Sequence, residues 1–185
     1  MKTKLAMFDL DGTLYDTRKI NYCSYRDALA QYGISLDYDY FSSRCNGKHY
    51  TEFLPQIMRG KNNIDEVHAI KKEKYIEYLG ESVENRYLFD IINGLKKEYY
   101  IALVTTASRK NCMEILNYHK RQNVFDLIVS QEDVKKKKPD PEGFLKAMEY
   151  FNVRSDDAII FEDSNVGIKA AASSGAAVFV VKGYA

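Results

Sequence analysis

Short apolar runs that recur along the chain constrain its fold more than any other feature. Residues 5–8, 101–104, 158–161 and 177–181 are apolar throughout, and residues 127–129 form a weaker run of the same kind. Runs that are apolar on both faces are typical of strands buried in a parallel sheet, because half-exposed strands alternate apolar with polar residues. The chain is therefore predicted to contain five buried strands.

Helical patterns lie between these runs. Two stretches repeat apolar residues at helical spacing: Leu88, Ile91, Ile92 and Leu95, and then Phe144, Leu145, Met148 and Phe151. The second stretch follows Asp140-Pro141, a pair that is typical of a helix start. Strands and helices that alternate in this way predict an α/β fold with a doubly wound, Rossmann-like sheet of five parallel strands.

Residues 16–86 depart from this alternation. We find no strand pattern in this segment, whereas helical patterns recur, for example at Ile64, Val67 and Ile70, with Gly80 as the expected end of a helix. We therefore expect a small helical domain at 16–86, inserted after the first strand into a core formed by 1–15 and 87–185.

Composition excludes several classes of function. The 27 basic and 26 acidic residues give a net charge of +1, so no global basic field is available to bind nucleic acid or a membrane. Asp9 ends the first apolar run far short of a signal sequence, and no run approaches the ~18 apolar residues of a membrane span. Three widely spaced cysteines favour reduced thiols, and we expect a soluble cytoplasmic protein, either a monomer or a weak homodimer.

Two acids follow the first run directly, in the sequence Asp9-Leu10-Asp11-Gly12-Thr13. In extended chain, residues two apart face the same side, so both carboxylates point into one pocket. Close carboxylates repel, which raises one pKa or recruits a cation. A calcium loop fits less well, because Thr13 and Leu14 stand where that loop needs an oxygen ligand and glycine. An ordinary turn at Asp11-Gly12 remains the alternative.

Polar residues also follow three later parts of the predicted sheet. Thr105 and Thr106 end the second strand just before a helix that starts near Ser108, where hydroxyls and free N–H groups suit either a phosphate or ordinary helix capping. Lys138 precedes a proline that favours a fixed extended shape, although the run 135–138 could simply be solvated. Glu162 and Asp163 end the fourth strand; Ser164 can cap the next helix and leave both acids free.

The order of these features is acid pair, hydroxyls, lysine and acid pair, and carboxyl ends of parallel strands meet at one ligand-binding edge. In this respect the chain resembles the haloacid dehalogenase superfamily of phosphohydrolases, whose four motifs read here FDLDGT, LVTTAS, KKPDP and FEDSNVG. The resemblance covers the whole chain. The helical insert resembles the cap of the subgroup that includes beta-phosphoglucomutase.

The resemblance implies a magnesium-dependent phosphatase of small phosphorylated metabolites, with a role for each motif residue. Asp9 is the implied nucleophile that forms an aspartyl-phosphate, and Asp11 the acid and base. Thr105 and Lys138 hold the phosphoryl oxygens, with Thr106 beside the substrate. The implied Mg²⁺ ligands are Asp9, the main-chain carbonyl of Asp11, and Asp163, assisted by Glu162.

The same resemblance bears on the choice of reaction and substrate. Asp11 argues against dehalogenation, because dehalogenating relatives lack this aspartate. Sugar phosphomutase remains the alternative, but it is weakened because Asn21 and Tyr50 stand where mutases carry histidine and arginine. Candidate substrate contacts are Gly47, Lys48, His49 and Tyr50 in the cap and Arg109 after the hydroxyl motif; the side chains of Lys48, His49 and Arg109 could equally face solvent.

Two readings outside enzymology also remain. A receiver-type phospho-acceptor domain shares the acids, the hydroxyl and the lysine, but it has no place for residues 16–86 and phosphorylates an aspartate after its third strand. A member of the family that has lost activity and serves as a binding scaffold becomes credible only if the purified protein turns over no phosphate ester.

Overall fold

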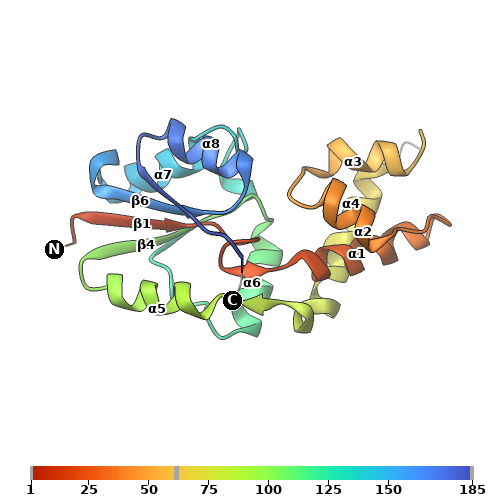
Figure 1. Cartoon of the computed structure of the whole chain (residues 1–185), viewed down its shortest axis with the longest axis horizontal. Helices are drawn as coiled ribbons and strands as arrows, with labels where there is room; N and C mark the ends of the chain where they lie inside the picture. Colours follow the sequence, from red (N-terminus) through yellow and green to blue (C-terminus); the bar gives the residue numbers. More distant parts are fainter. Residues whose placement is uncertain (1, 61–62, 184–185) are drawn as a thin grey trace. The chain divides into compact units, whose positions relative to one another are not determined.

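The computed structural model describes residues 2–60 and 63–183, which divide into two compact units. One unit contains the chain up to Asp16 and again from Val83 onward, and the other contains Thr17–Ser82. The two units are described separately below (Figure 1).

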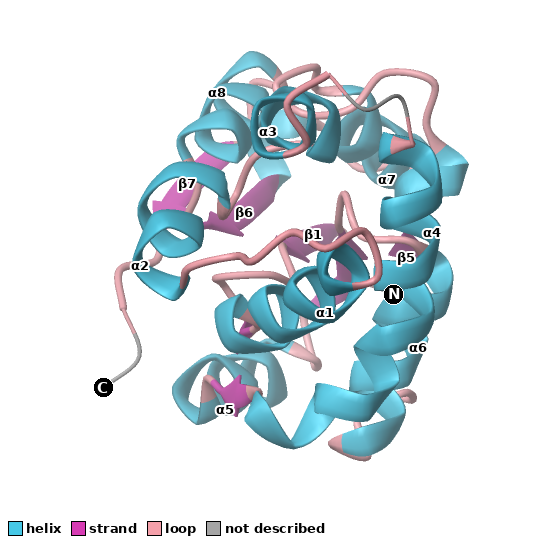
Figure 2. Cartoon of the chain, turned by 90° about the vertical axis from the view of Figure 1, so that its right-hand side faces the viewer, coloured by secondary structure: helices cyan, strands magenta, loops and turns pink. Residues whose placement is uncertain are grey.

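A five-stranded parallel sheet forms the centre of the first unit. Its strands are β1 (Lys4–Phe8), β4 (Tyr99–Val104), β5 (Leu127–Val129), β6 (Ala158–Glu162) and β7 (Ala177–Val180). They lie in the order β5-β4-β1-β6-β7, and all four neighbouring pairs are parallel. The labelled strands β7, β6, β1 and β5 follow one another in this order across Figure 2. The predicted parallel sheet of five strands is confirmed.

Helices cover both faces of this sheet. They are α5 (Arg86–Leu95), α6 (Arg109–Tyr118), α7 (Glu142–Phe151) and α8 (Asn165–Ser173). Figure 1 shows α7 and α8 on one face and α5 and α6 on the other. Leu5 and Met7 of the central strand β1 pack with Phe144 and Ala170 in one fully apolar cluster. The alternation predicted from the sequence therefore produces a doubly wound fold, because the apolar central strands need helices on both faces of the sheet to be buried.

Two expectations about strands were wrong. Residues 177–181 were predicted to form a buried strand, but Phe179 and Val180 of β7 are 54% and 41% exposed, because β7 lies at the edge of the sheet. The segment 16–86 was expected to contain no strand, yet β3 (Val83–Glu84) pairs antiparallel with β2 (Tyr15–Asp16). Two-residue strands are too short to give any periodic signal.

The second unit is helical. It contains α1 (Arg18–Ala30), α2 (Tyr38–Tyr40), the π-helix η1 (Phe41–Cys45), α3 (Tyr50–Ile57), α4 (Ile64–Lys74) and the 3₁₀-helix η2 (Tyr75–Glu81). Its core gathers aromatic and aliphatic side chains such as Tyr25, Phe41, Phe53, Leu54 and Val67. Gly80 was expected to end a helix: α4 ends at Lys74, and the 3₁₀-helix η2 that follows it directly ends at Glu81, one residue beyond Gly80.

In the described ranges of the chain, no helix has the length and apolar character needed to cross a bilayer.

Candidate active site

The central strand β1 delivers Asp9 to the carboxyl edge of the sheet. The Asp9 backbone N–H donates to the Phe161 carbonyl over 3.0 Å, so the residue continues the pairing between β1 and β6. Its side chain is buried, and Oδ1 accepts a hydrogen bond from Lys138 Nζ at 2.5 Å. A buried carboxylate next to an ammonium group at a strand end is the arrangement that the sequence predicted for this pair.

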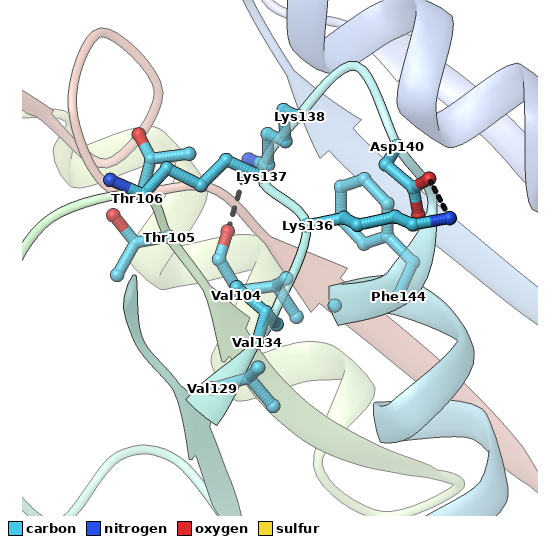
Figure 3. A pocket seen from close by; sticks show the side chains of 11 residues that line it. Val104, Thr105, Thr106, Val129, Val134, Lys136, Lys137, Lys138, Asp140 and Phe144 are labelled. Atoms are coloured by element: carbon cyan, nitrogen blue, oxygen red, sulfur yellow. Dashed lines mark hydrogen bonds and ion pairs between the residues drawn. The ribbon is translucent and has the colours of Figure 1, made fainter. Parts of the chain in front are cut away.

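Lys138 connects three elements of the sheet through one ammonium group. Besides Asp9, its Nζ donates to Glu162 Oε1 at 2.8 Å and to the Val104 carbonyl at the end of β4 at 3.1 Å. Its side chain is only 7% exposed. Figure 3 shows Lys138 in a loop that passes Thr105 and Thr106, with the bond to Val104 drawn as a dashed line. The lysine is therefore a fixed interior charge rather than part of a solvated run.

The turn after Asp9 brings Asp163 against the backbone. Gly12 has a φ of +92°, and a Cβ at this position would lie 2.1 Å from Asp163 Oδ2. Thr13, which is fully buried, donates its hydroxyl to Asp163 Oδ1 over 2.9 Å. Only glycine fits at position 12, because the carboxylate occupies the space of a side chain and the φ is left-handed. Thr13 was not predicted as a functional residue, although the Gly12-Thr13 pair is part of the first motif.

Glu162 is hydrogen-bonded to Ser164, the residue expected to cap the next helix. Ser164 does cap α8, but its N–H and hydroxyl also donate to Glu162 Oε2 at 2.7 and 3.1 Å. The other oxygen, Oε1, accepts from Lys138. A Cβ on Gly167 would lie 1.6 Å from Oε1, so the carboxylate is enclosed by the first turn of the helix. Ser164 therefore caps the helix as expected, and the two oxygens of Glu162 both accept donors from the protein.

The hydroxyl motif also lies at this edge. Thr105 is buried, and its Oγ1 accepts the Ala107 N–H at 3.0 Å, while the neighbouring Thr106 is exposed. Both threonines line one pocket with Lys136, Lys137 and Lys138 (Figure 3). The helix α6 starts at Arg109 behind Ser108, as the sequence predicted, and Ser108 caps it through the Asn111 N–H.

The remaining candidate substrate contacts are Arg109 and residues of the helical unit. Arg109 is exposed and donates to Asp133 Oδ2 at 2.6 Å and to the Ile128 carbonyl at 3.1 Å, so its guanidinium is held by β5 and the turn that follows β5. Gly47, Lys48 and His49 belong to the helical unit, where they form the turn before α3. His49 Nδ1 lies 2.8 Å from Thr51 Oγ1. Their contact with substrate stays a prediction.

The carboxylates at the sheet edge carry more negative charge than Lys138 alone balances. Burial raises the pKa of Asp9 above its ordinary value, and Lys138 opposes this shift. Burial also raises the pKa of Asp163 to about 6, with contributions from the charges of Glu162 and Asp11. Raised carboxyl pKa values of this kind mark a place where a cation would be stabilised.

The chemistry of these donors fits a hard divalent cation. Asp9 and Asp163 offer carboxylate oxygens, and the turn through Asp11 offers main-chain carbonyls, which are the ligands that Mg²⁺ prefers alongside water. Across residues 2–60 and 63–183, no three His, Cys, Asp or Glu side chains cluster as a metal site would. A Mg²⁺ site does not need such a cluster, because it uses one or two carboxylates and retains several waters.

Comparison with known proteins identifies the family of the chain. The family model of haloacid dehalogenase-like hydrolases matches residues 6–181. A phosphorylated carbohydrates phosphatase of Thermotoga maritima is 32% identical over 175 residues, which cover 92% of this chain and 81% of the relative. Fructose-1-phosphate phosphatase YqaB of Escherichia coli is 29% identical over 173 residues, with 91% of both chains covered.

A solved structure shares the fold. CbbY from Rhodobacter sphaeroides, crystallised in complex with phosphate, has a TM-score of 0.85 at 23% identity, and the match covers 98% of this chain and 87% of that one. The family model spans nearly the whole sequence, including all four motifs. The chain therefore belongs to the haloacid dehalogenase-like hydrolase family.

Proposed function

We propose that this protein is a magnesium-dependent phosphatase that hydrolyses small phosphorylated metabolites through an aspartyl-phosphate. The observation that carries the proposal is the buried contact of 2.5 Å between Lys138 Nζ and Asp9 Oδ1 at the carboxyl end of β1. A nucleophile for phosphoryl transfer needs positive charge close to the oxygens that transfer to it. Relatives named as phosphatases of phosphorylated carbohydrates support the same reaction.

Two displacements complete the proposed reaction. A carboxylate oxygen of Asp9 attacks phosphorus, the bond to the ester oxygen breaks, and Asp11 gives a proton to that leaving oxygen. Water then attacks the aspartyl-phosphate, Asp11 takes the proton from this water, and phosphate and free Asp9 are released. Lys138 and the Thr105 hydroxyl hold phosphoryl oxygens during both displacements, because the chemistry depends mainly on positioning and charge neutralisation.

Phosphatases of this family generally use Mg²⁺. In this chain Asp9, the main-chain carbonyl of Asp11 and Asp163 would hold the ion. When bound, Mg²⁺ would offset the negative charge of the carboxylates and of the transferring phosphoryl group. Thr13 orients Asp163 for this task through its hydroxyl bond of 2.9 Å. We assign Glu162 to holding Lys138, because its oxygens bind Lys138 and Ser164.

We infer that the helical unit selects the substrate. Lys48 and His49 are polar groups on one turn of this unit, and relatives act on sugar phosphates, which carry hydroxyl groups as well as the phosphate. A cap of this kind also excludes water from the reacting groups. The described cysteines, Cys23, Cys45 and Cys112, are buried and free, which supports the proposed cytoplasmic location. We keep a monomer or a weak homodimer as the proposed assembly.

Phosphate release from a panel of esters tests the proposal. Sugar phosphates, nucleotides, phosphoglycolate and pyrophosphate are incubated with the purified protein, with and without Mg²⁺, and free phosphate is measured. Asp9→Asn should abolish turnover, while Asp90→Asn on the exposed face of α5 should leave it unchanged. Near-normal turnover by Asp9→Asn would remove Asp9 from the role of nucleophile. An isomerised sugar phosphate without free phosphate, seen by phosphorus NMR, would replace the phosphatase by a mutase.

A further inference from the structure

The turn that carries Asp11 is closed onto the segment where the chain returns from the helical unit. Inside the turn, the Leu14 and Tyr15 N–H groups donate to the Leu10 carbonyl at 3.0 Å, and Gly12 N–H donates to the Tyr15 carbonyl at 2.8 Å. Tyr15 then pairs with Glu84 in the two-stranded ladder of β2 and β3. The turn is thus a compact loop whose outer side faces residues 83–85.

Asn85 makes two hydrogen bonds to this turn. Its backbone N–H donates to the Leu14 carbonyl at 2.9 Å, and its side-chain Nδ2 donates to the Thr13 carbonyl at 3.3 Å. Its Oδ1 accepts the Leu88 N–H at 3.3 Å, which caps α5. Asn85 is only 9% exposed, so water cannot easily replace these partners.

These partners also fix the orientation of the amide. The Leu88 N–H can only donate and the Thr13 carbonyl can only accept, so Oδ1 must face the helix and Nδ2 must face the turn. A side chain that caps a helix needs an acceptor alone, and Asp or Ser would serve as well. The amide donor is therefore the part of Asn85 that capping does not explain.

We propose that Asn85 is a positioning residue for Asp11: its amide holds the Thr13 carbonyl, and with it the turn whose carboxylate must reach the ester oxygen. The proposal rests on the proposed function, which gives Asp11 the proton transfer. Displacement of an acid by about 1 Å can cost on the order of 10²-fold in rate. Asn85 touches no reacting atom in this proposal and acts through the backbone of residues 13 and 14.

Two variants separate the donor from the cap. Asn85→Asp and Asn85→Ser both keep an acceptor for the Leu88 N–H; Asp has no donor for the Thr13 carbonyl, and Ser replaces the amide with a hydroxyl on a shorter side chain. Each is assayed for kcat/KM on an alkyl ester, glycerol 2-phosphate, and on p-nitrophenyl phosphate, whose leaving group needs no proton. We expect a fall of about 10- to 100-fold on the alkyl ester and less than about threefold on the aryl ester. Ile92→Val, a mild change in the buried face of α5, is the stability control and should leave the ratio of the two substrates unchanged.

Hydrogen exchange supplies a readout that does not depend on activity. Asn85→Asp should speed exchange of residues 10–15 and leave residues 88–95, whose cap survives, as slow as in the parent. Equal losses on both esters, or faster exchange in both segments, would reduce Asn85 to a structural cap and overturn the proposal. Unchanged exchange in residues 10–15 would overturn it as well. A parent protein that hydrolyses no ester would defeat the proposed function, and the exchange result would still decide whether Asn85 holds the turn.

Discussion

Replacement of Lys138 by methionine tests how much one buried ammonium group contributes. Methionine keeps an unbranched side chain and removes the charge, which leaves Asp9 and Glu162 side by side without their shared donor. Two unit charges 2.5 Å apart attract by roughly 7 kcal/mol at an effective dielectric constant of about 20. The cost of burying both charges offsets part of this attraction, and loss of one partner from a buried pair costs about 3–5 kcal/mol.

The expected results concern both turnover and stability. Turnover should fall roughly 10²- to 10³-fold, the effect of removing one electrostatic contact to a transition state. The free energy of unfolding, measured with urea in EDTA at pH 7, should fall by about 3–5 kcal/mol. Lys135→Met is the matched control: Lys135 is exposed in the same run, so its loss should change stability by less than about 0.5 kcal/mol.

The pH dependence of this loss gives the sharper test. Burial raises the pKa of Asp9, so the native protein binds a proton that the unfolded chain releases above the ordinary carboxyl pKa. Stability therefore falls as pH rises through the range between the two pKa values. Without Lys138 the pKa of Asp9 rises further, so the deficit of the variant should be smallest in acid and largest near neutrality. A deficit that does not change with pH, or turnover above a tenth of the parent value, would refute the reasoning.

Two further predictions concern the support of the site. Gly167→Ala should lower both stability and turnover, because its Cβ would lie 1.6 Å from Glu162 Oε1. In Gly94→Ala the new Cβ meets nothing within 4 Å, so this variant should raise the free energy of unfolding in urea by about 0.5–1 kcal/mol through the helix propensity of α5. Opposite signs for the two variants are expected, and a neutral Gly167→Ala contradicts the geometry. Hydrogen bonds, first that from the Lys135 N–H, lower the pKa of Glu142 to about 2, so its contribution to stability is present above about pH 4.5 and lost as pH falls towards 2. In Glu142→Gln the midpoint of urea unfolding should change less with pH across that window than in the parent. A pH profile identical to that of the parent would contradict the lowered pKa of Glu142.

Apolar runs identified the strands because burial in a parallel sheet leaves no polar face. The same runs do not predict the order of the strands in the sheet. Residues 177–181 are as apolar as residues 5–8, although β7 lies at the edge of the sheet and β1 at its centre. Order depends on how the helices cross over between strands, and local composition does not record it. The β2–β3 pair was missed for a different reason, since two residues cannot establish a period.

The sequence could predict pairs of motif residues with opposite charges, such as Asp9 and Lys138. Residues that support them through the backbone could not be predicted. Asn85 reads as an ordinary helix cap, and its bond to the Thr13 carbonyl depends on how two distant segments meet. Glu162 was missed as a partner of Lys138 because an acid at a strand end has several possible uses, and only the packing of Gly167 against it selects one.

The position of β1 at the centre of the sheet has a consequence for biosynthesis. Lys4 pairs with Tyr99 and Leu5 pairs with Ala158, so β1 is synthesised before both of its neighbours in the sheet and stays unpaired until residues 99–162 have emerged. At about 5–20 residues per second this delay lasts many seconds, during which an apolar segment has no sheet to join. The helical segment Thr17–Ser82 has its own apolar core and emerges in the interval. A nascent chain of this design offers chaperones a defined and long-lived apolar target in the segment of β1.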